Sequence, residues 1–126
     1  IVIVARDYAE KYTGTTDLEE ACRIIYERGA LIAGVTDGAN GSYFVWPDGT
    51  FYRCQAFPQE HVVDTTGAGD FYAAGFLYGL TCGYSLEKCA QISSILAGYV
   101  IQTVGTALTK KKWNEIKLNI ESVLQA

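Results

Sequence analysis

The residues best suited to chemistry lie in one glycine-rich stretch, Asp64-Thr65-Thr66-Gly67-Ala68-Gly69-Asp70. A β-branched pair, Val62-Val63, precedes the stretch and an apolar run follows it. This pattern predicts the end of a strand, a tight turn and the start of a buried helix. The backbone N–H groups of residues 67–70 would then lie at a helix N-terminus, where the helix dipole favours an anion.

Asp70 falls in the same predicted turn as these N–H groups. A carboxylate does not help to bind an anion, because like charges repel each other. It would be useful as a general base that takes the proton from a hydroxyl attacking the bound anion. The amides of Gly67, Ala68 and Gly69 would then form the anion hole. The pattern indicates phosphoryl transfer; the alternative is an ordinary strand-to-helix turn in which Asp70 is a helix N-terminal charge.

Other nucleotide-binding patterns are missing around this stretch. No Gly-Lys-Ser/Thr follows it, so it is not a Walker A loop. The chain also lacks the G-x-G-x-x-G pattern that a Rossmann-type dinucleotide-binding domain carries after its first strand.

The elements that would position this stretch follow from hydrophobic patterning and from caps. The expected strands cover 1–4, 30–35, 42–46, 50–54 and a segment near 61–63, and the expected helices cover 6–12, 18–28, 67–81, 86–103 and 110–126. The order strand, helix, helix, strand in the first third favours an α/β layer with parallel strands. The Pro47-Asp48-Gly49 turn predicts a β-hairpin.

Composition limits the classes of function. The chain has 126 residues, 49% of them hydrophobic and 19% charged, which predicts one packed domain. A net charge of −4 argues against nucleic acid and anionic membranes as partners. The apolar start, residues 1–5, is too short to span a membrane. No methionine occurs, even at position 1, so we expect the chain to be a piece of a longer one.

Cysteine and histidine usage is informative as well. Four cysteines (Cys22, Cys54, Cys82 and Cys89) lie in apolar surroundings without a C-x-x-C pair. We expect buried free thiols and therefore a cytoplasmic location, with a Cys82–Cys89 disulfide as the alternative. The single histidine, His61, leaves too few ligands for a zinc site or a histidine-based triad.

The glycine-rich stretch, followed by Ala74-Gly75-Phe76-Leu77, closely resembles the C-terminal signature of the ribokinase-like (PfkB) carbohydrate kinases. The resemblance implies a three-layer α/β/α fold with a mostly parallel sheet and a β-hairpin. It also implies that residues 1–126 are the C-terminal nucleotide-binding and catalytic portion of such a kinase. The implied reaction is ATP-dependent phosphorylation of a hydroxymethyl group on a sugar or nucleoside, with Mg²⁺ and with Asp70 as the base.

Two further stretches fit the same resemblance. Val35-Thr36-Asp37-Gly38 is similar to the family's Thr-x-Gly turn, in which Thr36 and Gly38 would lie along ATP, although the family often has an apolar residue at Asp37. Ser93 would lie on the helix that flanks the adenine. In many members a monovalent cation, here K⁺, is held by positions that match Asp64, Thr66, Val100, Thr103, Gly105 and Thr109. Without the resemblance, Asp37-Gly38 is an ordinary turn and Gly105 is a helix C-cap.

One departure from the family motivates an alternative function. Members usually carry Asn-x-x-Glu after the strand that corresponds to residues 1–4, and this motif helps to organise magnesium. The matching positions here are Ala5 and Tyr8. The alternative is therefore a weakened or inactive pseudokinase, or a scaffold with the same fold. The expected partner is a small sugar or nucleoside, not nucleic acid or membrane, and a homodimer is left open.

Overall fold

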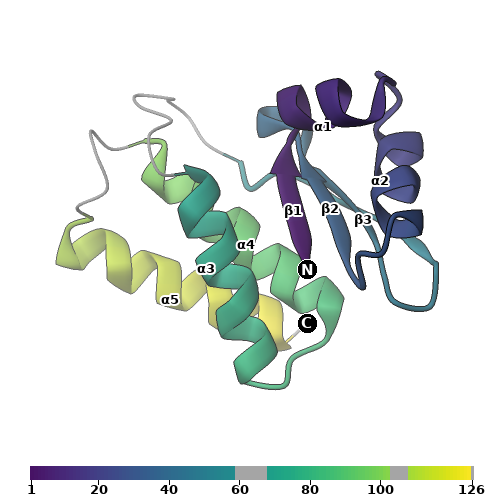
Figure 1. Cartoon of the computed structure of the whole chain (residues 1–126). Coiled ribbons are helices and arrows are strands. Elements are labelled where there is room, and N and C mark those ends of the chain that lie inside the picture. The colour runs from purple at the N-terminus through teal and green to yellow at the C-terminus, as the bar shows by residue number, and fades with distance from the viewer. Residues whose placement is uncertain (59–67, 103–107, 126) are drawn as a thin grey trace. The chain divides into compact units, whose positions relative to one another are not determined.

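The computed structural model describes residues 1–58, 68–102 and 108–125, and its chain divides into two compact units, 1–55 and 56–126 (Figure 1). Within the described part of the first unit, four strands form one sheet in the order β1-β2-β3-β4. The elements are β1 (Val2–Ala5), α1 (Arg6–Thr13), α2 (Leu18–Glu27), β2 (Ala33–Thr36), a 3₁₀ turn η1 (Gly38–Asn40), β3 (Ser42–Val45) and β4 (Phe51–Cys54). Strands β1 and β2 are parallel, whereas β2–β3 and β3–β4 are antiparallel.

The helix boundaries of the first unit follow their predicted caps. Helix α1 ends at Gly14, whose backbone N–H donates to the Glu10 carbonyl at 2.8 Å. Helix α2 begins after Asp17, whose Oδ1 accepts hydrogen bonds from the N–H groups of Glu19 and Glu20 at 3.1 and 3.2 Å. These bonds satisfy two of the N–H groups that a helix start leaves without partners.

Both helices pack on one face of the sheet. Ala9 of α1 and Ile25 of α2 belong to the same buried cluster as Val35 and Val45 of the sheet. Cys22 lies in this cluster too, and its Sγ donates to the Tyr43 carbonyl at 3.3 Å. Burial raises the pKa of the Cys22 thiol to about 12, so it stays protonated and acts as a small core residue.

All four cysteines are free, which confirms the expectation of free thiols. The alternative, a Cys82–Cys89 disulfide, is not formed. The expectation of burial is confirmed for Cys22, Cys54 and Cys89 and is wrong for Cys82, which is exposed. Cys82 follows the last residue of a helix, where the chain turns through Gly83, and a residue in such a turn faces solvent although its sequence neighbours are apolar.

The predicted hairpin is confirmed, with Val45 opposite Phe51. The Gly49 N–H donates to the Trp46 carbonyl at 2.8 Å, which closes the turn. Asp48 Oδ1 accepts hydrogen bonds from the backbone N–H and the hydroxyl of Thr50, at 3.0 and 2.7 Å. Such local side-chain bonds explain why a Pro-Asp-Gly sequence turns the chain here.

The described part of the second unit contains helices α3 (Ala68–Thr81), α4 (Leu86–Val100) and α5 (Lys110–Gln125), with α4 in contact with both others (Figure 1). Ser85 and Thr109 cap α4 and α5, as predicted, by accepting from the N–H groups of Lys88 and Lys112. Helix α4 ends at Val100, somewhat before the expected end near Thr103. The strand expected near 61–63 lies outside the described residues.

Helices α3 and α4 approach closely because glycines face α4. A Cβ atom on Gly79 would lie 2.6 Å from Cys89 Sγ and 3.1 Å from Cys89 Cα. A Cβ atom on Gly75 would lie 3.0 Å from Ser93 Cα. Any larger residue at these two positions would push the helices apart. None of the helices in the described ranges is both long and apolar enough to cross a membrane.

Candidate active site

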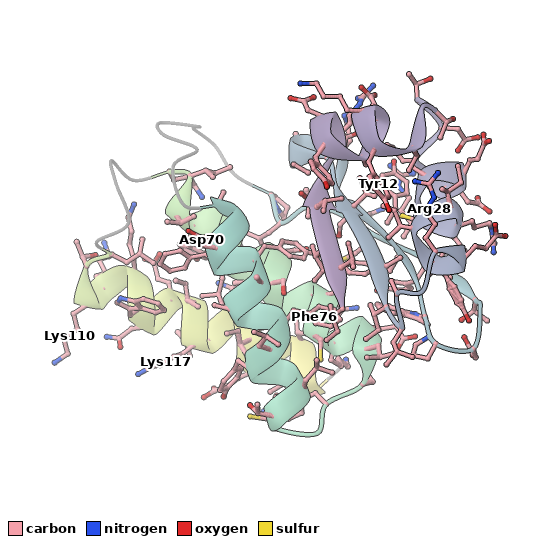
Figure 2. All side chains as sticks on the ribbon, viewed as in Figure 1. Tyr12, Arg28, Asp70, Phe76, Lys110 and Lys117 are labelled. Carbon is pink, nitrogen blue, oxygen red and sulfur yellow. The ribbon has the colours of Figure 1, made fainter. Side chains whose placement is uncertain are left out.

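Asp70 lies in the first turn of α3, where its side chain is exposed (Figure 2). Ala68 and Gly69 precede it in the same turn. Among the described residues, no atom would lie within 4 Å of a Cβ atom on Gly69, so they leave open space beside this backbone. Gly67, the remaining residue of the predicted anion hole, lies outside the described residues.

This turn combines a donor-rich backbone with a carboxylate. The first four N–H groups of an α-helix have no acceptor within the helix, so those at the start of α3 can donate to an anion. The helix dipole adds to their effect, and α3 is 14 residues long. A carboxylate in the same turn can accept a proton from a hydroxyl that approaches the bound anion.

The second predicted site segment lies in the first unit, where the chain turns after β2. Thr36 is the last residue of β2, and Gly38 begins η1 with a positive φ of 52°. The Asp37 N–H donates to the Gly41 carbonyl at 2.8 Å, and the Asn40 N–H donates to the Asp37 carbonyl at 2.9 Å. The left-handed conformation at Gly38 explains why a glycine is needed in this turn.

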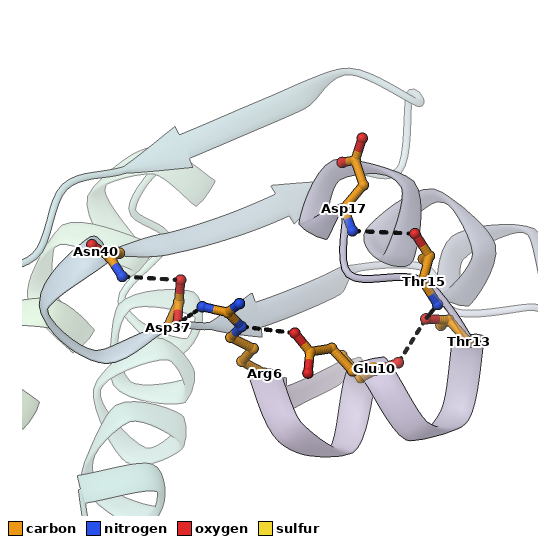
Figure 3. Close-up of polar contacts among 8 residues, drawn as sticks. Arg6, Glu10, Thr13, Thr15, Asp17, Asp37 and Asn40 are labelled. Atoms are coloured by element: carbon orange, nitrogen blue, oxygen red, sulfur yellow. Dashed lines mark hydrogen bonds and ion pairs between the residues drawn. The ribbon is translucent and has the colours of Figure 1, made fainter.

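Among the described residues, the Asp37 carboxylate has two side-chain partners (Figure 3). Arg6 Nη1 donates to Oδ1 at 3.4 Å, and Asn40 Nδ2 donates to Oδ2 at 3.3 Å. Arg6 also donates from Nε to Glu10 Oε1 at 2.8 Å. The hydrogen bond to Glu10, together with the charge of Asp37, raises the pKa of Arg6 above its usual value, so the guanidinium stays charged.

The sequence reasoning missed Arg6. Strands β1 and β2 run parallel with Ala5 opposite Thr36. The residues that follow these strands, Arg6 and Asp37, are therefore neighbours at the same edge of the sheet. Opposite charges directly after two parallel strands are compatible with such a pair, but the sequence of neither strand specifies the register that brings them together.

Ala5 and Tyr8, the positions matched to the family's Asn-x-x-Glu, offer no amide or carboxylate side chain. Tyr8 stacks on Tyr12 with ring centroids 5.9 Å apart. Tyr12 in turn lies under the guanidinium of Arg28, which is 4.7 Å from its ring centroid (Figure 2). The Tyr8 position therefore presents a stacked aromatic ring in place of the carboxylate of the family motif.

The residues predicted to hold K⁺ are described only in part. Asp64, Thr66, Thr103 and Gly105 lie outside the described residues. Val100 is the last residue of α4, and because its buried side chain is a hydrocarbon, only its carbonyl could be a ligand. Thr109 accepts with Oγ1 from Lys112 N–H at 3.2 Å and with its carbonyl from Trp113 N–H at 3.0 Å. The described residues contain no group of three or more His, Cys, Asp or Glu side chains that could hold a metal.

Ser93, predicted on the adenine side, is fully buried where α4 contacts α3. Its Oγ has no hydrogen-bond partner within the described part of the chain. Its neighbour Ser94 differs, because Ser94 Oγ donates to the Ala90 carbonyl at 3.0 Å. Ser93 therefore does not offer an exposed hydroxyl to a ligand. The prediction that remains is that α4, the helix on which Ser93 lies, flanks the adenine.

We expect the substitution Ser93→Ala to raise the free energy of unfolding by about 1 kcal/mol, because it removes a buried hydroxyl without a partner. Ser94→Ala is the matched control and should lower stability slightly, because it removes a bonded hydroxyl. Urea denaturation of both variants measures the difference. A clear loss of stability in Ser93→Ala would mean that the hydroxyl has a partner.

Comparison with known proteins places these features in a family. The pfkB family of carbohydrate kinases matches residues 1–113. A cytidine kinase of Thermococcus kodakarensis is 34% identical over 110 residues, which are 86% of this chain and 36% of that protein.

Two solved structures share the fold. The adenosine kinase of Sinorhizobium meliloti has a TM-score of 0.82 and 37% identity, over 93% of this chain and 35% of that one. A probable sugar kinase of Rhizobium etli CFN 42 has a TM-score of 0.84 and 37% identity, over 97% of this chain and 36% of that one. The chain thus spans about a third of the length of these relatives. The likeness confirms the expected ribokinase-like α/β fold.

The family match covers most of the chain, including α3 with Asp70 and the turn after β2. The chain therefore belongs to the pfkB family of carbohydrate kinases.

Proposed function

We propose that residues 1–126 are the C-terminal, nucleotide-binding and catalytic portion of a kinase that phosphorylates a hydroxymethyl group on a sugar or nucleoside. The observation that carries the proposal is the first turn of α3, where the exposed Asp70 carboxylate lies beside helix N-terminal amides and open space at Gly69. Relatives named cytidine kinase and adenosine kinase support a small-molecule acceptor.

In the proposed reaction, the acceptor hydroxyl attacks the γ-phosphorus of ATP and the bond to the β,γ-bridging oxygen breaks. Asp70 accepts the hydroxyl proton, and ADP leaves with the bond's electron pair. The amides of Gly67, Ala68 and Gly69 would donate to the equatorial oxygens of the transferred group. Such donors are effective because they need no reorganisation during the reaction.

The resemblance to the family assigns nucleotide contacts to further residues of each unit. Thr36 and Gly38 would lie along ATP, and α4 at Ser93 would flank the adenine. Mg²⁺ would neutralise charge on the phosphates; this ion often keeps several waters and needs few protein ligands, so the lack of a ligand cluster in the described ranges is compatible with it. K⁺ prefers hard oxygen ligands. Carbonyl and side-chain oxygens of this kind would come from Asp64, Thr66, Val100, Thr103, Gly105 and Thr109.

A pseudokinase or scaffold is the second candidate. It is favoured by one observation: Ala5 and Tyr8, at the positions matched to the family's Asn-x-x-Glu, carry neither an amide nor a carboxylate, and the Tyr8 ring stacks on Tyr12. The proposals of a cytoplasmic location and of a homodimer stand with either candidate.

Transfer of phosphate to a panel of sugars and nucleosides tests the function. The intact protein that contains residues 1–126 is incubated with ATP and Mg²⁺, and phosphorylated products are detected by mass spectrometry. The kinase proposal predicts a product from at least one acceptor class, with a rate that depends on Mg²⁺ and rises with K⁺. ATP binding without any phosphorylated product would support the pseudokinase, and the absence of both would contradict the proposed function.

A further inference from the structure

An ion pair joins the residues that follow the two parallel strands. Ala5 of β1 lies opposite Thr36 of β2, and beyond them Arg6 Nη1 lies 3.4 Å from Asp37 Oδ1 (Figure 3). The Asp37 side chain is 14% exposed, whereas that of Arg6 is 45% exposed. The carboxylate is therefore the less solvated partner, and it depends more on the pair than Arg6 does.

The Asp37 carboxylate is held from a second direction by the turn itself. Asn40 Nδ2 donates to Oδ2 at 3.3 Å, and the Asp37 main chain bonds to Gly41 and Asn40. Arg6 is in turn fixed by Glu10 at 2.8 Å. These bonds connect α1 to the turn at residues 36–41, so a change at Arg6 can alter the turn through Asp37.

The negative charge of Asp37 affects how the turn after β2 could bind a nucleotide. Asp37 lies between Thr36 and Gly38, which the proposed function places along ATP, and a bare carboxylate would repel the phosphates. Arg6 supplies a positive charge next to Asp37.

We propose that Arg6 is a positioning residue for nucleotide binding. Its guanidinium neutralises Asp37 and holds the turn after β2 in the conformation that offers Thr36 and Gly38 to ATP. Arg6 acts through Asp37 and does not contact the phosphates. This inference rests on the proposed function.

The test compares four variants of the intact protein that contains residues 1–126: Arg6→Gln, Arg6→Lys, the double variant Arg6→Gln/Asp37→Asn, and the control Arg23→Gln. Arg23 forms a similar i,i+4 pair with Glu19 and is also 45% exposed, but its bonding partners lie outside the turn at residues 36–41. ATP affinity is measured by calorimetry, and KM and kcat are measured with an acceptor, at low and high salt.

Arg6→Gln should raise the KM and the dissociation constant for ATP about three- to ten-fold at low salt, with kcat within about two-fold of wild type. The increase should shrink at high salt, because screening weakens repulsion from Asp37. The double variant and Arg6→Lys should return to within about two-fold of wild type, and Arg23→Gln should not differ from it.

The outcomes separate this inference from the proposed function. An Arg6→Gln protein that binds ATP like wild type would overturn the role of Arg6. A defect that persists in the double variant, and at high salt, would also overturn it, because Arg6 would then act on the phosphates directly. A wild-type protein that binds no ATP would contradict the proposed function itself.

Discussion

Replacing Asp70 with asparagine is expected to lower kcat for phosphoryl transfer by about 10²- to 10⁴-fold, the usual contribution of a general base. Asparagine keeps the shape of the side chain but cannot take the proton of the acceptor hydroxyl. Asp70 is exposed in the first turn of α3, so the substitution should leave packing unchanged. The measurement is steady-state turnover with ATP and an acceptor found in the panel.

The same variant should keep the KM for ATP within about three-fold of wild type, because loss of a negative charge beside an anion site does not weaken anion binding. Glu87→Gln is the matched control, since Glu87 is also an acidic residue in the first turn of a helix in the same unit. It should turn over like wild type. Undiminished turnover in Asp70→Asn would mean that Asp70 is not the base.

The second large effect is on stability. Phe76→Ala should lower the free energy of unfolding by about 3–5 kcal/mol, because it removes a large side chain and leaves a cavity. Phe76 is fully buried and lies on α3, the helix whose first turn carries the proposed base Asp70 (Figure 2). Urea denaturation, with the slope of the transition compared as well as its midpoint, measures the loss.

Leu77→Ala is the control for Phe76→Ala. Leu77 is the next residue on the same helix and is 54% exposed, so its truncation should cost less than about 1 kcal/mol. Below the unfolding transition, activity of Phe76→Ala should follow the folded fraction with the KM for ATP unchanged. Equal losses of stability in both variants would contradict the packing of α3 described above.

Local signals were sufficient for much of the fold. Asp17, Ser85 and Thr109 cap the helices for which they were predicted, and Gly14 ends α1. These features depend on bonds between residues a few positions apart, so their residue types reveal them. The placement of Asp70 in the first turn of α3 was predictable for the same reason.

Features that depend on contacts between distant segments were not predictable. The pairing of Arg6 with Asp37 requires the register of β1 against β2, which neither strand's sequence specifies. The contact of Gly79 with Cys89 requires the approach of α3 to α4. Composition indicates that such residues are compatible with a core, but it does not indicate their neighbours.

A single-turnover measurement tests the role of Asp70 most directly, because kcat in such enzymes can be limited by product release and not by chemistry. Enzyme in excess over γ-labelled ATP is mixed with the acceptor, and the label transferred is followed by rapid quench for wild type and Asp70→Asn. We predict that the wild-type protein transfers the label rapidly. Asp70→Asn should still bind ATP but should transfer the label at least about 10²-fold more slowly. Equal rate constants for the two proteins would contradict the assignment of Asp70 as the general base.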